Sequence, residues 1–249
     1  MSFKDHFSGV SRGYAEFRPR YPDALFDFLA GLCAERRLAW DCACGTGQAS
    51  LALAERFERV VATDASAEQI EAAEPHARVV YRVAQAERSG LDAESADLVT
   101  VAQALHWFDL DAFYSEVNRV LRPGGVLAVW TYGLLTIHLP EADDAMRRFY
   151  RTLDPWWPPE RKLVDTGYRT IPFPFDEVTA PPFEIEARWS PPQLVGYVRT
   201  WSAVSRCLRE RGEDPAAPFE RELRAVWGAP DTTRAVTWPI ALRVGRRRS

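Results

Sequence analysis

The chain has 249 residues, of which 47% are hydrophobic and 27% are charged, as is typical of a globular protein. A formal net charge of −4 gives no sign of a nucleic-acid partner, and no apolar run is long enough to cross a bilayer. The first residues lack the apolar core of a signal peptide, and the four cysteines lack metal-site spacing, so we expect a cytoplasmic protein without metal or membrane association.

The segment from residue 38 to residue 131 alternates strand-like and helix-like stretches. Apolar and β-branched stretches predict strands over residues 38–42, 59–64, 77–84, 96–102 and 126–131. Helices are predicted between them over residues 48–57, 66–74 and 109–121. Ser66 and Gln69 have the spacing of a capping box at the start of the second of these helices. This alternation predicts an α/β fold with a doubly wound, mostly parallel sheet.

Prolines and tryptophans become frequent after Gly133, which marks a change in organisation. Two further strands are predicted over residues 183–189 and 236–244, which brings the sheet to seven strands. Helices are predicted over residues 193–211 and 219–227. We therefore divide the chain into an N-terminal segment with a first helix, a core, a proline- and tryptophan-rich cap, and a C-terminal part that completes the sheet and adds substrate-side helices. The corresponding residues are 1–37, 38–133, 134–182 and 183–249.

The stretch Asp41-Cys-Ala-Cys-Gly45-Thr-Gly47 joins the first core strand to a helix. Its glycines let a ligand approach the backbone closely, and ligands of open parallel sheets bind at this end of the strands. The pattern lacks the lysine of a phosphate-binding loop, and Ser50 stands where a dinucleotide fold needs a third glycine. The carboxylate of Asp41 suits a ligand with a positive charge, such as an ammonium or a sulfonium.

Asp64 closes the second strand, where a carboxylate can accept hydrogen bonds from both hydroxyls of a ribose. Asp64 alone does not distinguish one adenosine cofactor from another. Asp41 and Asp64 together favour S-adenosylmethionine, because one carboxylate suits its amino-acid end and the other suits its sugar.

The chain resembles class I S-adenosylmethionine-dependent methyltransferases through several motifs in the family's order. The motifs are Asp41, Cys44-Gly-Thr-Gly47, Asp64, Ala86-Glu87 and Arg122-Pro-Gly-Gly125. More narrowly, Tyr14-Ala-Glu-Phe-Arg18-Pro-Arg-Tyr21-Pro and Ala104-Leu-His106-Trp107-Phe-Asp109 are similar to the type 11 and trans-aconitate methyltransferase subgroup.

The resemblance implies a set of cofactor-binding residues. They are Tyr14, Arg18, Asp41, Cys44, Gly45, Thr46, Gly47, Asp64, Ala65, Ile70, Gln85, Ala86, Glu87, Gln103 and His106. It implies that Tyr14 and Arg18 approach the methionine carboxylate. Gln85 replaces the aspartate that many members use to bind the adenine amine, and its amide oxygen can accept the same bond. Ile70 either covers the adenine or packs its helix on the sheet.

His106 and Trp107 follow the fourth strand, at the edge where a transferred methyl group would meet its acceptor. His106 is the candidate catalytic residue, since it could orient a substrate or accept its proton; it could equally line the cofactor pocket or only cap the loop. Aromatic residues are expected to line the acceptor pocket, although core packing is the alternative for each one taken singly. These residues are Trp107, Trp130, Tyr132, Trp156, Trp157 and Trp201.

The sequence therefore predicts an S-adenosylmethionine-dependent methyltransferase that acts on a small organic molecule, with a carboxylate as the preferred acceptor. The alternatives are a non-catalytic protein that binds S-adenosylmethionine or a nucleotide, and a dinucleotide-dependent oxidoreductase. The oligomeric state is left open.

Overall fold

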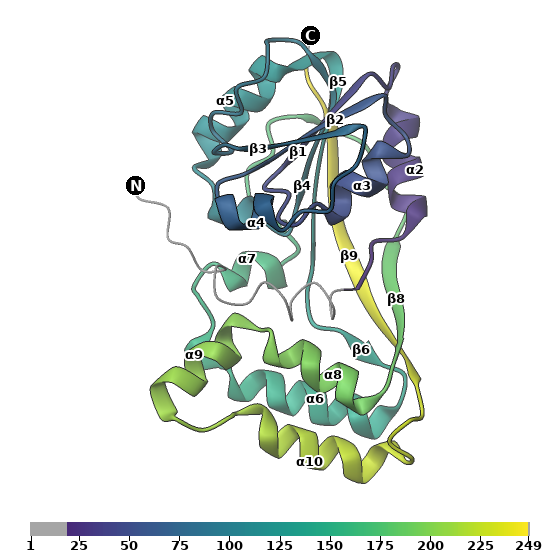
Figure 1. Cartoon of the computed structure of the whole chain (residues 1–249), viewed down its shortest axis with the longest axis vertical. Helices are drawn as coiled ribbons and strands as arrows, with labels where there is room; N and C mark the ends of the chain where they lie inside the picture. Colours follow the sequence, from purple (N-terminus) through teal and green to yellow (C-terminus); the bar gives the residue numbers. More distant parts are fainter. Residues whose placement is uncertain (1–18, 249) are drawn as a thin grey trace.

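A central β-sheet with helices on both faces organises the computed structural model, which describes residues 19–248 (Figure 1). The strands are β1 (Leu38–Cys42), β2 (Arg59–Asp64), β3 (Val79–Val83), β4 (Ala96–Ala102), β5 (Leu121–Tyr132), β6 (Thr136–Ile137), β7 (Asp176–Glu177), β8 (Phe183–Trp189) and β9 (Arg234–Arg246). The α-helices are α2 (Asp23–Leu32), α3 (Gln48–Ala54), α4 (Ala67–Glu71), α5 (Leu110–Val120), α6 (Pro140–Thr152), α7 (Arg161–Asp165), α8 (Pro191–Arg199), α9 (Ser202–Arg211) and α10 (Ala216–Trp227). Two 3₁₀ turns are η1 (Leu105–Trp107) and η2 (Asp154–Trp156).

The sheet order is β3-β2-β1-β4-β5-β9-β6, with the first five strands parallel and β9 antiparallel to β5. Helices α2 and α3 cover one face of the sheet and α5 covers the other, which confirms the predicted doubly wound fold (Figure 1). The predicted number of seven strands is wrong, because the sheet of the described residues has nine. The reason is the length of β9: its 13 residues pair with β5, β6, β7 and β8.

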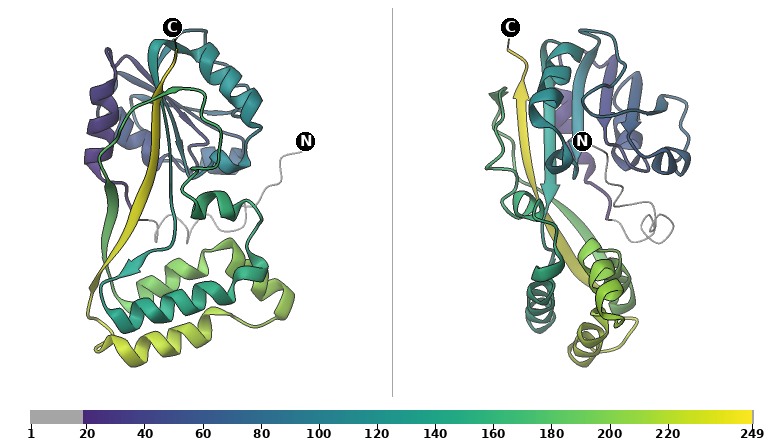
Figure 2. Two further views of the ribbon diagram at one scale, coloured as in Figure 1. Left: turned by 180° about the vertical axis from the view of Figure 1, so that it is seen from behind. Right: turned by 90° about the vertical axis from the view of Figure 1, so that its left-hand side faces the viewer.

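The carboxyl ends of the parallel strands face a lower lobe made of α6, α8, α9 and α10 (Figure 1). Strand β9 runs through both lobes, as the view from behind shows (Figure 2). The lower lobe takes its helices from the proline-rich segment and from the C-terminal part. One apolar cluster continues from the α2–α3 face of the sheet into these helices, and includes Phe26 and Trp130 above and Met146 and Trp227 below. The sheet and the lower lobe therefore share one of the two hydrophobic clusters of the described residues.

The helix predicted over residues 193–211 is wrong, because the structure divides it into α8 and α9. Trp201 takes an extended conformation between the two helices and caps the second. In this position its ring stacks on Phe149 with a centroid distance of 6.1 Å. Packing of this ring against α6 accounts for the break, which local helix propensity alone does not predict.

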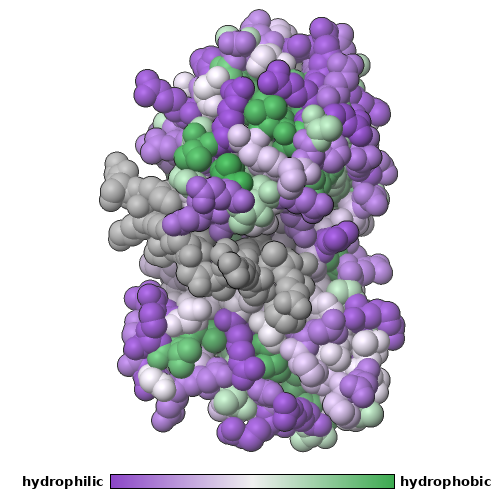
Figure 3. All heavy atoms as spheres, in the orientation of Figure 1, coloured by the Kyte–Doolittle hydropathy of each residue, from purple (hydrophilic) through white to green (hydrophobic). Residues whose placement is uncertain are grey.

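Hydrophilic residues dominate the face shown in Figure 3, and the apolar residues there form separate patches. Among the described residues, the large apolar side chains that are exposed are Val83, Trp107 and Leu208. None of the helices described here has the length and hydropathy needed to span a membrane.

Candidate functional site

The turn between β1 and α3 has a backbone shape that few residues other than glycine adopt. Ala43, Gly45 and Gly47 all have positive φ angles, of 54°, 55° and 88°. The turn is fixed to the end of β2: Cys44 N donates to Thr63 O at 3.0 Å, and Gly45 N donates to Asp64 Oδ2 at 2.9 Å. The predicted turn thus lies directly beside Asp64.

Gly47 is also required by close packing. A Cβ atom on Gly47 would lie 2.9 Å from both Cε1 and Cζ of Tyr81, and even closer to its hydroxyl oxygen. A Cβ on Gly45 would have nothing nearer than Gln69 Oε1 at 3.7 Å. Gly47 therefore allows Tyr81 of β3 to pack against the start of α3, whereas a Cβ on Gly45 would make only an ordinary van der Waals contact with Gln69.

Asp41 lies beneath the turn, with none of its surface exposed. Ser50 Oγ donates to one of its carboxylate oxygens at 2.5 Å and Thr100 Oγ1 donates to the other at 2.9 Å. Burial raises the pKa of Asp41 to about 6, and the two hydroxyl bonds oppose this rise. Asp41 thus connects β1 to α3 and β4 from below. Its predicted contact with the charged end of a ligand stays a prediction.

The start of α4 forms a second wall of the turn. Ser66 Oγ accepts from Gln69 N, as the predicted capping box requires, but Ser66 N donates to Asp64 Oδ1 instead of to the Gln69 side chain. The Gln69 side chain is buried against Gly45. The sequence predicts only a capping role for Gln69. Ile70 is half-buried and packs against neither hydrophobic cluster of the described residues, which favours its predicted role as a ligand cover.

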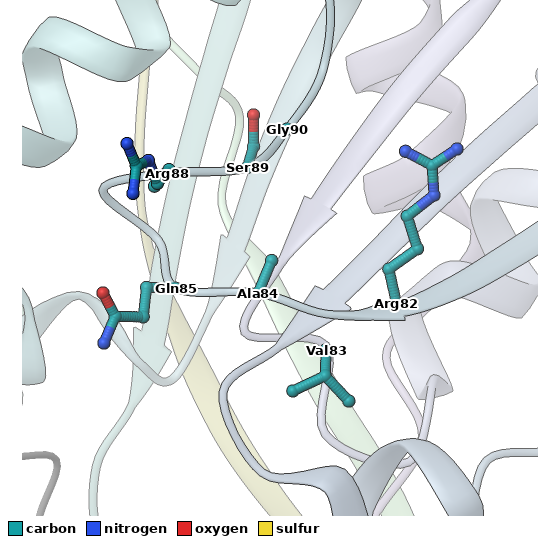
Figure 4. Close-up of a pocket in the computed structure, with 7 residues that line it drawn as sticks. All are labelled: Arg82, Val83, Ala84, Gln85, Arg88, Ser89 and Gly90. Atoms are coloured by element: carbon teal, nitrogen blue, oxygen red, sulfur yellow. The ribbon is translucent and has the colours of Figure 1, made fainter.

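The loop after β3 carries the residues expected near an adenine. Gln85 is exposed and lines a surface hollow of about 480 Å³ with Val83 and Arg88; Figure 4 shows that the Gln85 and Arg82 side chains point away from each other. Ala86 is buried, and Glu87 Oε1 accepts from the backbone N–H of Asp109 at 3.1 Å. Glu87 therefore supports the segment that leads into α5.

A hydrogen-bonded chain connects the ends of β4 and β5 to the cap. Gln103, with φ of 59°, accepts from Thr131 Oγ1 at 2.5 Å and donates to Tyr132 O at 3.0 Å. Tyr168 is completely buried near Thr131, and its hydroxyl bonds to Nδ1 of His106 at 2.8 Å. A strained backbone at Gln103 and a buried tyrosine beside His106 are features that cluster at functional sites.

His106 is a neutral side chain in this environment. Burial, and to a lesser degree the positive charge of Arg161, lowers its pKa from 6.5 to about 4. A ring with so low a pKa is a weak base near neutral pH. The geometry thus favours a hydrogen-bonding role for His106 over proton abstraction.

The six aromatic residues expected in the acceptor pocket do not form one group. Trp130 and Tyr132 are buried beside Tyr21, and Trp156 donates from Nε1 to Glu210 at 2.9 Å. Trp107 is 37% exposed beside His106.

Trp157 and Trp201 lie together, with ring centroids 5.7 Å apart, and both contact Tyr150. The structure therefore brings Trp157 and Trp201 together and adds Tyr150 to them. Trp130 and Tyr132 form a second group with Tyr21. Tyr14 and Arg18, predicted near a cofactor carboxylate, lie outside the described residues.

Comparisons with known proteins identify the family of this chain. The profile of a family described as a methyltransferase domain matches residues 40–129. A Dictyostelium discoideum protein with a methyltransferase name is 36% identical over 235 residues, which are 92% of this chain and 89% of that protein. The chain belongs to the class I S-adenosylmethionine-dependent methyltransferases.

Further relatives support this methyltransferase assignment. A solved structure from Anaeromyxobacter dehalogenans, titled as a type II methyltransferase, is 52% identical with a TM-score of 0.88, and the match covers 93% of this chain and 98% of that one. An uncharacterized methyltransferase of Mycobacterium tuberculosis is 41% identical over 128 residues, about half of each chain.

Replacing Gly47 with alanine should lower the free energy of unfolding by about 2–4 kcal/mol, because the new Cβ meets the Tyr81 ring and the positive φ becomes strained. Gly45→Ala should cost only about 1–2 kcal/mol, since the new Cβ would make only an ordinary van der Waals contact with Gln69. Urea unfolding monitored by circular dichroism measures both. Equal losses would show that Tyr81 does not restrict the turn.

The depressed pKa of His106 predicts a dependence of stability on pH. Between about pH 6.5 and about pH 4 the unfolded imidazole binds a proton that the folded ring does not, so stability should fall as the pH is lowered through this range. His106→Gln should lose this part of the dependence. Urea unfolding of both proteins at about pH 7 and about pH 5 tests it. If the stability of His106→Gln falls between these two pH values as much as that of the wild type, the depressed pKa of His106 is contradicted.

Proposed function

We propose that this methyltransferase binds S-adenosylmethionine at the turn after β1 and transfers its methyl group to a small organic acceptor in the cytoplasm, with a carboxylate as the preferred acceptor group. The observation that carries the proposal is the half-exposed turn fixed to Asp64 at the carboxyl edge of the sheet. The similarity of two sequence segments to the trans-aconitate methyltransferase subgroup supports the preference for a carboxylate.

The residues at this edge fit S-adenosylmethionine. Gly45 has no side chain to keep a ligand away from the backbone, and the carboxylate of Asp64 has about four acceptor positions with which to bind backbone N–H groups and ribose hydroxyls. Ile70 is placed to cover the adenine. When bound, S-adenosylmethionine supplies a methyl group already activated by the positive sulfur.

The protein's own residues then have mainly to position the acceptor. A carboxylate is nucleophilic near neutral pH, so no side chain needs to remove a proton from it, which agrees with the low pKa of His106. Holding the acceptor in line and excluding water can contribute about 7–11 kcal/mol to lowering the barrier. Tyr168 fixes the ring of His106 at this edge through their hydrogen bond.

Binding of S-adenosylhomocysteine, the product form of the cofactor, tests the proposal by calorimetry. Asp64→Ala should weaken this binding about 10- to 100-fold, because hydrogen bonds from ribose hydroxyls to a carboxylate are lost. Asp144→Ala, an exposed acid on α6, is the matched control and should bind as the wild type does. Equal affinity of both variants would remove Asp64 from the site.

Two further measurements separate the alternatives. Affinity for NAD without affinity for S-adenosylhomocysteine would favour an oxidoreductase. Transfer of a labelled methyl group to members of a panel of small acids distinguishes catalysis from binding alone. Cofactor binding with no transfer to any organic acceptor would favour the non-catalytic alternative.

A further inference from the structure

Arg161 lies at the start of α7, a short helix of the cap that packs against η1 and β5. Of these two elements, η1 carries His106, and β5 is the strand that pairs with β4. The backbone N–H of Tyr168 donates to Leu163 O of the same helix at 2.9 Å, and the Tyr168 hydroxyl bonds to His106. The helix that carries Arg161 is therefore connected through Tyr168 to His106, at the edge of the sheet where methyl transfer is proposed.

The guanidinium group of Arg161 is held in a fixed orientation. It lies over the ring of Trp157 at 4.6 Å from the centroid and over the ring of Tyr150 at 5.4 Å. Its Nε donates to Tyr150 Oη at 2.9 Å and to Asp165 Oδ1 at 3.0 Å. An arginine that stacks on two rings in this way loses little further freedom when it binds a ligand.

Some N–H donors of the Arg161 guanidinium group make no hydrogen bond within the described part of the chain. Among residues 19–248, neither terminal nitrogen of Arg161 has a hydrogen-bond partner, and neither does the buried Nε1 of Trp157 beside it or Nε2 of His106. Asp165 contacts only Nε, and it also accepts from the Tyr150 hydroxyl. The cap thus presents a planar pair of cationic N–H donors next to a buried indole N–H.

We propose that Arg161 binds an anionic oxygen group of the methyl acceptor and thereby selects the acceptor. A guanidinium fork matches the two oxygens of a carboxylate, and the rings of Trp157 and Trp201 offer an apolar surface for the rest of the molecule. The assignment rests on the function proposed above and adds to it the residue that recognises the acceptor.

The test compares acids with their amides, which have the same shape without the charge. Phenylacetate, cinnamate and fumarate, each paired with its amide, are titrated by calorimetry into protein saturated with S-adenosylhomocysteine. The wild type should bind at least one acid about ten times more tightly than its amide. Arg161→Gln should remove this preference, and Arg161→Lys should keep only part of it, because lysine retains the charge and loses the fork.

Arg169→Gln changes an exposed arginine of the same segment and should keep the full preference. All variants should bind S-adenosylhomocysteine as the wild type does. The proposal is overturned if the wild type prefers no acid, or if Arg161→Gln keeps the preference. If Arg161→Gln does not fold, the comparison of the wild type with Arg161→Lys is used instead, and an undiminished preference for the acid in Arg161→Lys overturns the proposal. If the wild type does not bind S-adenosylhomocysteine at all, that result would instead contradict the proposed function itself.

Discussion

The site depends on how one carboxylate fixes two neighbouring segments. Asp64 accepts from Gly45 with one oxygen and from Ser66 with the other, so it holds both the turn after β1 and the start of α4. Asp41 holds the start of α3, directly after this turn, through Ser50. Both donors to Asp64 are backbone N–H groups, one in the turn and one at the start of α4. The width of the proposed nucleoside site between these two segments is therefore set by backbone geometry more than by side-chain packing.

A second constraint connects the cap to the core. Tyr168 comes from the proline-rich segment, yet its hydroxyl is buried against His106 at the end of β4. The same segment places Arg161 and Trp157 nearby, and one apolar cluster continues from the sheet into the lower helices. The proposed acceptor side therefore combines residues that are far apart in sequence, whereas the proposed cofactor side comes mainly from consecutive strand ends.

Local patterns predict the fold and the position of the turn, because both depend on neighbouring residues. Short apolar runs bounded by polar residues give β1, β2, β4 and β8 with their observed bounds. The four pairings of β9 and the break at Trp201 depend on tertiary contacts and could not be predicted in this way. The same holds for the packing of Tyr81 on Gly47. Alternation along β5 places Trp130 in the core and Thr131 on the opposite face, which composition alone does not reveal.

We infer that the turn after β1 and Asp64 hold the nucleoside end of the cofactor. A crystal structure with S-adenosylhomocysteine tests it most directly. We expect the ribose hydroxyls within hydrogen-bonding distance of Asp64, the adenine beside Ile70, and the sulfur facing the edge that carries His106. Density for the compound away from the turn between β1 and α3 would contradict it.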